Sequence, residues 1–239
     1  MKSISCLEPG EVHIWCNTFS HDMTVLTRME SFLAPNELIR AERLRDRSLR
    51  QRFVAGRGFL RETLAHYLAV EPDHIQLTAN EYGKPYLADI TGLNSRRPYF
   101  NLSHSGEFIL LAISDSCELG VDVETVHDAM PFLDMMKLVF SKQEQENLLD
   151  LPQHLQREAF YRCWTRKEAY LKGCGLGFTL PATSITVSLL PDEPLAIVPG
   201  LGTNTACSVH WNLMDLAVPN GYCAALAIEG EPPLLRYVS

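Results

Sequence analysis

Two long stretches with helical periodicity, 35–68 and 141–172, restrict the possible folds of this chain more than any other feature. A shift of 107 residues superimposes their starts, placing residues 33–37 (LAPNE) on residues 140–144 (FSKQE). Pro35 stands at the first helical position of one stretch, and Ser141 with Glu144 forms a capping box at the start of the other. Because strand patterns flank each stretch, we predict two similar α+β halves, with chance agreement as the alternative.

Apolar runs rich in β-branched residues predict six strands between and around these helices. They lie at 11–19, 108–114, 119–124, 183–190, 206–213 and 222–229. The turn clusters EYGKP, SHSGE, GCGLG and VPNGY separate the elements. GCGLG follows a helix instead of opening one, so a C-terminal helix cap is a better interpretation than a phosphate loop. The halves meet near residues 114–119, and a cleft between them is the natural place for a ligand.

The net charge of −8 hides a basic segment in the first half. Between residues 34 and 61 eight arginines face three acidic residues, a local charge of +5. Such a segment suits nucleic acid, phosphate or an acidic partner protein, whereas a solvated helix face is the structural alternative and accounts for about half of the arginines. Only Phe53 and Phe59 interleave with them, which disfavours a nucleic-acid surface.

The remaining composition is typical of a soluble cytoplasmic protein. No apolar run approaches the ~20 residues that cross a bilayer, and the first residues lack a secretory pattern. Seven scattered cysteines form no C-x-x-C pair and have no finger-like spacing with histidine. We therefore expect no membrane partner, no disulfide framework and no zinc site.

Two acidic motifs are predicted to point at one place. In LGVDVE (119–124), alternate strand residues share a face, so Asp122 and Glu124 point the same way and repel each other unless a cation lies between them. Simple solvation on an exposed strand is the alternative. In WTRKEAYLK, Glu168 lies four residues before Lys172 on one helix face. A surface ion pair worth ~0.3–0.5 kcal/mol is the alternative there.

Asp122, Glu124 and Glu168 together would form an oxygen-only site. Hard oxygen ligands suit magnesium, for which manganese can substitute. Lys167 and Lys172 stand beside Glu168 and would be available to phosphate oxygens. A magnesium ion with lysines and without cysteine or histidine ligands indicates phosphoryl-type transfer.

Five sequence blocks resemble those of the 4′-phosphopantetheinyl transferases, in the order found in that family. GVDVE, followed about forty residues later by WTRKEAYLK, resembles the family signature. EYGKPYL (81–87), YFNLSHSGEFILLAIS (99–114) and FSKQEQENLL (140–149) resemble the larger, surfactin-synthetase-activator type. The resemblance implies two α+β halves related by a pseudo-twofold axis, each an antiparallel sheet packed with a long helix. Residues 1–114 would bind the nucleotide of coenzyme A and residues 115–239 would hold magnesium, in a monomer.

The same resemblance implies an activity. The 4′-phosphopantetheine arm of coenzyme A would pass to a serine of an apo acyl or peptidyl carrier protein, releasing adenosine 3′,5′-bisphosphate. Asp122, Glu124 and Glu168 would hold magnesium, Lys172 would stabilise charge on the phosphate bridge, and Glu168 is the first candidate for the base. The alternatives are a catalytically inactive scaffold that binds carrier proteins and a nucleic-acid-binding module using residues 40–61.

The contacts with coenzyme A are also implied by the resemblance. Lys84 and Pro85 would lie on the adenine side, although GKP could be only a turn. His104 would approach the phosphates, although a lone histidine is often a buried structural residue. Glu37 departs from the family, in which a basic residue is frequent at this position. The predicted coenzyme A contacts are Arg40, Arg52, Lys84, Pro85, Ser103, His104, Lys167 and Lys172.

Overall fold

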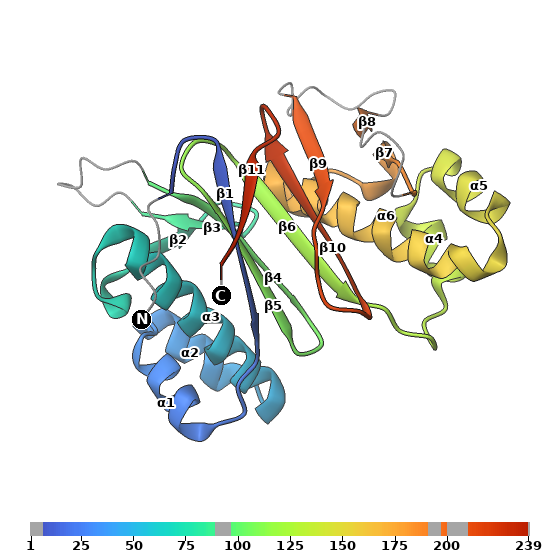
Figure 1. The fold of residues 1–239 in the computed structure, drawn as a ribbon. Coiled ribbons are helices and arrows are strands. Elements are labelled where there is room, and N and C mark those ends of the chain that lie inside the picture. The colour runs from blue at the N-terminus through green and yellow to red at the C-terminus, as the bar shows by residue number, and fades with distance from the viewer. Residues whose placement is uncertain (1–6, 89–96, 191–196, 200–209, 239) are drawn as a thin grey trace.

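Two sheets stand side by side in the centre of the molecule, and helices cover the outer face of each (Figure 1). The computed structural model describes residues 7–88, 97–190, 197–199 and 210–238. The layers follow the order helices, first sheet, second sheet, helices, which confirms the predicted α+β class.

The first sheet has the order β11-β1-β5-β4. Its strands are β1 (Glu11–Thr18), β4 (Tyr99–Ser105), β5 (Phe108–Ser114) and β11 (Leu234–Val238). β1, β5 and β4 are antiparallel, as predicted. β11 instead runs parallel to β1 and comes from the far end of the chain, so the sheet is mixed.

The second sheet is antiparallel and has the order β6-β10-β9. Its strands are β6 (Leu119–Thr125), β10 (Tyr222–Glu229) and β9 (Trp211–Asp215). Two small hairpins complete the strands, formed by β2 (Leu77–Ala79) with β3 (Pro85–Leu87) and by β7 (Ile185–Val187) with β8 (Ile197–Pro199). The strand predicted at 183–190 is thus shorter. The first part of the strand predicted at 206–213 lies outside the described residues, and β9 extends two residues past its predicted end.

Each predicted helical stretch divides into a short helix and a long one. The helices are α1 (Met23–Ser31), α2 (Pro35–Arg43), α3 (Arg47–Leu68), α4 (Phe132–Val139), α5 (Lys142–Asp150) and α6 (Gln153–Cys174). The side chain of Asp46 caps α3, and Pro152 precedes α6, so a new helix starts at each point. The Ser141–Glu144 capping box is present, and Gly175 ends α6 in the left-handed conformation, as predicted for GCGLG. No described helix carries an apolar stretch that could span a bilayer.

Alternate side chains of β5 pack on opposite faces of the first sheet, one set against α3 and the other against the second sheet. Leu111 packs with Leu60 and Leu64 of α3, whereas Leu110 packs with Val121 on the second sheet. All five side chains have no exposed surface. Because β5 is covered on both faces, its sequence FILLAIS is a continuous apolar run and does not alternate with polar residues.

The two helix pairs repeat the same buried interaction. α2 and α5 have nine residues each, and α3 and α6 have 22. In each short helix the third residue, Glu37 or Glu144, accepts a hydrogen bond from the N-cap backbone and pairs with a buried cation of the long helix. Glu37 binds Arg61 at 2.7 Å and Glu144 binds Lys167. These matching contacts support a true sequence repeat.

The second of these pairs leads to a stability prediction. Glu144 is fully buried and Lys167 is 2% exposed, so Lys167→Met would leave a buried carboxylate without its cation. We expect the free energy of unfolding to fall by about 3–5 kcal/mol. Lys137→Met is the matched control, because Lys137 pairs with Asp134 on an exposed helix face and should cost less than about 1 kcal/mol. Urea unfolding measures both, and equal losses would contradict the structural role of Lys167.

Candidate active site

The two sheets are joined along β4 and β6 by side chains instead of a backbone ladder. The strands run in the same direction, and oxygen atoms on β4 accept hydrogen bonds from backbone N–H groups twenty residues later on β6. The pairs are Asn101 with Val121 at 3.0 Å, Ser103 with Val123 at 3.3 Å, and Ser105 with Thr125 at 3.1 Å. We call this row of contacts the β4–β6 seam. It satisfies the outer N–H groups of β6 and fixes where the acidic residues of β6 lie.

Asp122 lies buried in the seam, with 3% of its surface exposed. Its Oδ1 accepts hydrogen bonds from Ser103 Oγ at 3.0 Å and from Lys172 Nζ at 2.6 Å. Its Oδ2 is also buried but has no hydrogen-bond partner among the described residues. Burial raises the pKa of Asp122, and the ammonium of Lys172 opposes that rise. One oxygen of this carboxylate is therefore left for a further ligand.

Glu124 and Glu168 are half-buried beside Asp122. Burial is the main cause that raises the pKa of both, and the negative charge of Asp122 raises each further. The charge of Glu124 also raises the pKa of Glu168. Ser105 Oγ donates to Glu124 Oε2 at 2.7 Å. The predicted three carboxylates thus lie within electrostatic reach of one another and share one positive neighbour, Lys172.

Their arrangement is not a preformed metal cage. Among the described residues, no group of three or more histidine, cysteine or acidic side chains is close enough to hold an ion. Lys172 instead occupies one oxygen of Asp122. The chemistry of the donors nevertheless fits a hard cation. All three are carboxylates whose ionised forms are disfavoured where they stand, and Asp122 Oδ2 has no hydrogen-bond partner within the described part of the chain.

A cavity of about 470 Å³ opens beside these groups and is lined by both halves of the chain. Lys84, Pro85, Glu168 and Lys172 contribute to its wall, together with Leu102 of β4. Much of the remaining wall is apolar and comes from α4 (Leu138, Val139) and from the segment after α6 (Leu180, Pro181). Two larger cavities, of about 780 and 950 Å³, contain none of the three carboxylates. Of these three cavities, the one at Glu168 is lined by a predicted carboxylate together with Lys84, Pro85 and Lys172, and Lys84 and Pro85 also line the cavity of about 780 Å³.

Lys84 lines this cavity, and its ammonium is already bonded within the protein. Nζ contacts Glu118 Oε2 at 2.5 Å, the carbonyl of Gly173 at 2.7 Å and the carbonyl of Leu119 at 3.2 Å. Asn80 donates to the carbonyl of Gly175 in the same region. The GKP turn is thus anchored to the C-terminal end of α6, and it forms one wall of the cleft between the halves.

Arg52 and His104 both lie against the ring of Phe19. The guanidinium of Arg52 is 5.5 Å above the Phe19 ring, and the His104 ring lies 5.7 Å from the same ring. Arg52 donates to the carbonyl of Gly106 at 2.6 Å and to Glu107 at 2.5 Å. His104 is exposed at the surface, yet partial desolvation lowers its pKa, and the charges of Lys172 and Arg52 lower that pKa further. Lys172, His104 and Arg52 are thus electrostatic neighbours.

Arg40, Glu37 and Lys167, which the sequence associated with phosphate binding, make contacts within the protein. Arg40 stacks on Phe53, with its guanidinium 5.2 Å from the ring. Glu37 faces the buried Arg61, so the residue that departs from the family pattern is a structural counterion. The predicted contact between Lys167 and the phosphates is wrong. Its ammonium is buried against Glu144 and the carbonyl of Ile185, so it is not free to reach substrate phosphates.

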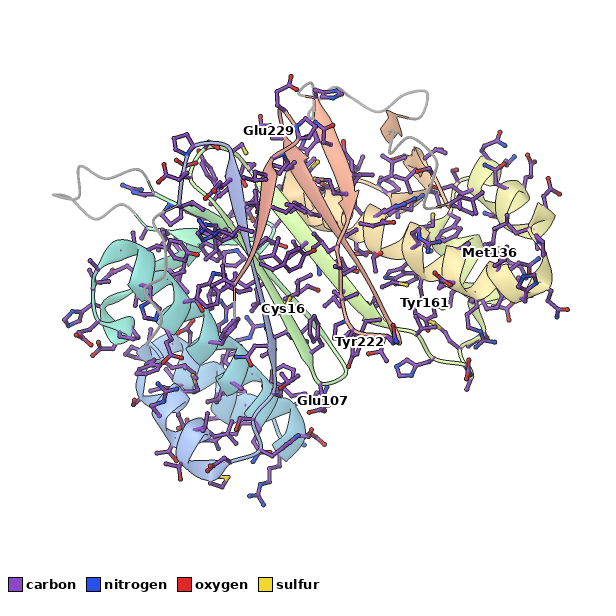
Figure 2. All side chains as sticks on the ribbon, viewed as in Figure 1. Cys16, Glu107, Met136, Tyr161, Tyr222 and Glu229 are labelled. Atoms are coloured by element: carbon purple, nitrogen blue, oxygen red, sulfur yellow. The ribbon has the colours of Figure 1, made fainter. Side chains whose placement is uncertain are left out.

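The sequence interpretation missed Asn101 and Ser105. A signal was present, because YFNLSHS places Asn101, Ser103 and Ser105 at every second position, which puts these polar side chains on one face of a strand. Figure 2 shows the end of this region, where Glu107 in the β4–β5 turn and Tyr222 at the start of β10 lie at the same end of the two sheets.

Known proteins are similar to this chain along most of its length. Residues 18–116 match the N-terminal family model described as 4′-phosphopantetheinyl transferase, and residues 118–227 match the model of the 4′-phosphopantetheinyl transferase superfamily. The 4′-phosphopantetheinyl transferase HetI of Nostoc sp. is 34% identical over 230 residues, covering 95% of this chain and 92% of the relative.

Two further relatives extend the comparison. A putative 4′-phosphopantetheinyl transferase of Synechocystis sp. is 33% identical, over 84% of this chain and 77% of its own. The 4′-phosphopantetheinyl transferase Sfp of Bacillus subtilis is 29% identical, over 83% of this chain and 84% of its own. The similarity to all three includes both halves of the chain.

Proposed function

This chain belongs to the 4′-phosphopantetheinyl transferase superfamily, and we propose that it moves the phosphopantetheine arm of coenzyme A onto a serine of an apo acyl or peptidyl carrier protein. The observation that carries the proposal is the Asp122–Lys172 pair. It leaves one carboxylate oxygen without a hydrogen-bond partner among the residues that the structure describes, and it lies beside Glu124, Glu168 and a cavity lined by both halves.

Magnesium is part of this proposal. Asp122, Glu124 and Glu168 would hold it, and manganese should replace it. When bound, the ion would neutralise charge on the pyrophosphate of coenzyme A. The same ion would offset the burial, and the repulsion from neighbouring carboxylates, that raise the pKa of Glu124 and Glu168.

The reaction assigns distinct tasks to Glu168 and Lys172. The serine oxygen of the carrier bonds to the phosphorus that bears the pantetheine arm, while the bond from that phosphorus to the bridging oxygen breaks. Adenosine 3′,5′-bisphosphate leaves with the bridging oxygen. Glu168, with its raised pKa and its place in the cavity wall, accepts the serine proton. Lys172, once released from Asp122, donates hydrogen bonds to the phosphate oxygens.

The nucleotide of coenzyme A would occupy the cavity on its N-terminal side. We assign Lys84 and Pro85 to the adenine side, and Ser103, His104 and Arg52 to the phosphates. Arg40 remains a proposed outer contact for the 3′-phosphate. Residues 1–114 would therefore serve nucleotide binding, and residues 115–239 would serve catalysis. Because one chain supplies both sides of the site, we propose that the protein acts as a monomer. We also propose that it acts in the cytoplasm.

Arg52→Ala tests the contact with the 3′-phosphate. Charge-assisted bonds to a phosphate contribute ~1.5–3 kcal/mol, so coenzyme A binding should weaken roughly ten- to a hundredfold. Binding of dephospho-coenzyme A should weaken less, as measured by calorimetry. Arg50→Ala is the matched control, because Arg50 lies on the same helix and pairs with the exposed Glu30. Equal weakening toward both nucleotides would show that Arg52 does not touch the 3′-phosphate.

Mass spectrometry of an apo carrier protein tests the activity itself. Incubation with coenzyme A and magnesium should add one phosphopantetheine arm per carrier, and a panel of fatty-acid, polyketide and peptide-synthetase carriers would identify the preferred class. Thermal stabilisation by coenzyme A with magnesium is the companion measurement. A protein stabilised by nucleic acid, with no carrier modified, would indicate the nucleic-acid-binding alternative. Carrier binding without modification would indicate the inactive scaffold.

A further inference from the structure

We propose that Ser105 is a positioning residue for the transfer reaction, because its hydroxyl holds Glu124 in the orientation that Glu124 shares with Asp122. The inference rests on the proposed function, since it concerns the site that would hold magnesium. Ser105 is not one of the residues that line the cavity described above, so it would act through Glu124.

The hydrogen bonds of Ser105 leave its hydroxyl one orientation. A serine hydroxyl has one proton to donate and two lone pairs that accept. Ser105 Oγ accepts from the backbone N–H of Thr125 at 3.1 Å and from the Thr125 hydroxyl at 3.4 Å. Its proton is therefore directed to Glu124 Oε2, at 2.7 Å. The carboxylate is tied to the backbone of its own strand through a single hydroxyl.

Ser103 makes the same connection two residues earlier. Its Oγ accepts from the backbone N–H of Val123 and from Lys172 Nζ, and it donates to Asp122 Oδ1. Both serines are thus bonded to a carboxylate nineteen residues later and to the following backbone N–H. Because the two carboxylates are held by consecutive contacts of the β4–β6 seam, the seam sets their relative position.

The turn after Ser105 keeps this contact short. Gly106 has φ +55°, and a Cβ there would lie 2.7 Å from Thr125 Oγ1 and 3.1 Å from the Tyr222 hydroxyl. Only glycine therefore lets the β4–β5 turn approach Thr125 this closely. Arg52 donates to the carbonyl of Gly106. The residue after Ser105 is thus bonded to the arginine assigned to the 3′-phosphate.

Without the hydroxyl, two groups lose their partner. The N–H of Thr125 would have no side-chain acceptor, and Glu124 would be free to sample other rotamers. Partners that orient a metal ligand typically change metal affinity by about 10- to 100-fold when they are removed. The effect should appear in metal affinity and in the magnesium dependence of transfer, whereas coenzyme A affinity without metal should stay unchanged.

A pair of nearly isosteric variants isolates the hydroxyl. Ser105→Thr keeps it and Ser105→Val replaces it with a methyl group, and both side chains suit a strand. We expect Ser105→Val to bind Mn²⁺ about 10- to 100-fold more weakly than the parent, measured by electron paramagnetic resonance titration with coenzyme A present. The magnesium concentration for half-maximal transfer should rise equally. Ser105→Thr should stay near the parent, as should Ser114→Ala, which removes a buried hydroxyl from β5.

Three results separate the possibilities. Parental Mn²⁺ affinity in Ser105→Val, or an equal loss in Ser105→Thr, would overturn the role of Ser105 while leaving the proposed function intact. A parent that neither binds Mn²⁺ nor modifies any carrier would overturn both. If Ser105→Val fails to fold, as judged by its thermal transition, Ser105→Ala carries the same comparison against Ser105→Thr and the same result decides it.

Discussion

Asp122→Asn should abolish carrier modification while the protein stays folded. The amide keeps the shape of the carboxylate and can still accept from Ser103 and Lys172, so the buried seam remains satisfied. It removes the charge that would hold magnesium. Loss of the metal should cost several kcal/mol of transition-state stabilisation, which corresponds to roughly a thousandfold in rate. Intact-mass analysis of the carrier measures this rate.

Two further measurements accompany Asp122→Asn. Removing metal from the parent with EDTA should cause a comparable loss, and added magnesium or manganese should restore the parent but not the variant. Asp134→Asn is the control, because Asp134 is exposed and pairs with Lys137 on α4. Parental turnover by Asp122→Asn at low magnesium would remove Asp122 from the site.

Glu168→Gln should separate catalysis from stability. General-base work typically contributes ~100- to 10,000-fold, so we expect at least about a hundredfold loss in the rate of carrier conversion. Coenzyme A binding should remain measurable. Thermal stability without metal should equal or exceed that of the parent, because folding raises the pKa of Glu168 and its ionised form therefore destabilises the native state.

The sign of this stability effect follows from the raised pKa. In the metal-free parent, the destabilisation is absent below the unfolded-state pKa of the carboxyl group and is complete above the raised native-state pKa. A glutamine removes it at all pH values, so the parent and variant should differ most at neutral and alkaline pH. Glu158→Gln, on an exposed part of the same helix, is the control for activity. A Glu168→Gln protein that turns over at the parental rate would return Glu168 to a surface role.

Local periodicity predicted much of this structure because the residues concerned are only a few positions apart in the sequence. Asp122 and Glu124 share a strand face through two-residue alternation alone, and the Ser141–Glu144 capping box spans one helical turn. The same kind of reasoning correctly interpreted GCGLG as a helix end.

Local periodicity could not predict contacts between segments that are far apart in the sequence. Helical spacing places Lys167 next to Glu168, but only the approach of α5 shows that Lys167 turns toward Glu144. The carbonyl of Gly106 and the side chain of Glu107 come to Arg52 from a hairpin more than fifty residues away. The β4–β6 seam depends on a register between two strands, which a strand pattern does not specify.

The parallel strand β11 ties the far end of the chain to its beginning. Leu234–Val238 pairs with Glu11–Trp15. The first sheet, whose other strands all come before residue 115, therefore receives its outer strand from the C-terminal segment. A chain cut between the halves would leave one fragment with an open sheet edge and the other with an unpaired strand of matching register. Such fragments would be complementary pieces that reassemble by strand donation, and the open edge of the first alone would be prone to aggregation. The two halves are therefore held together twice, by the peptide chain between them and by the hydrogen bonds between β1 and β11.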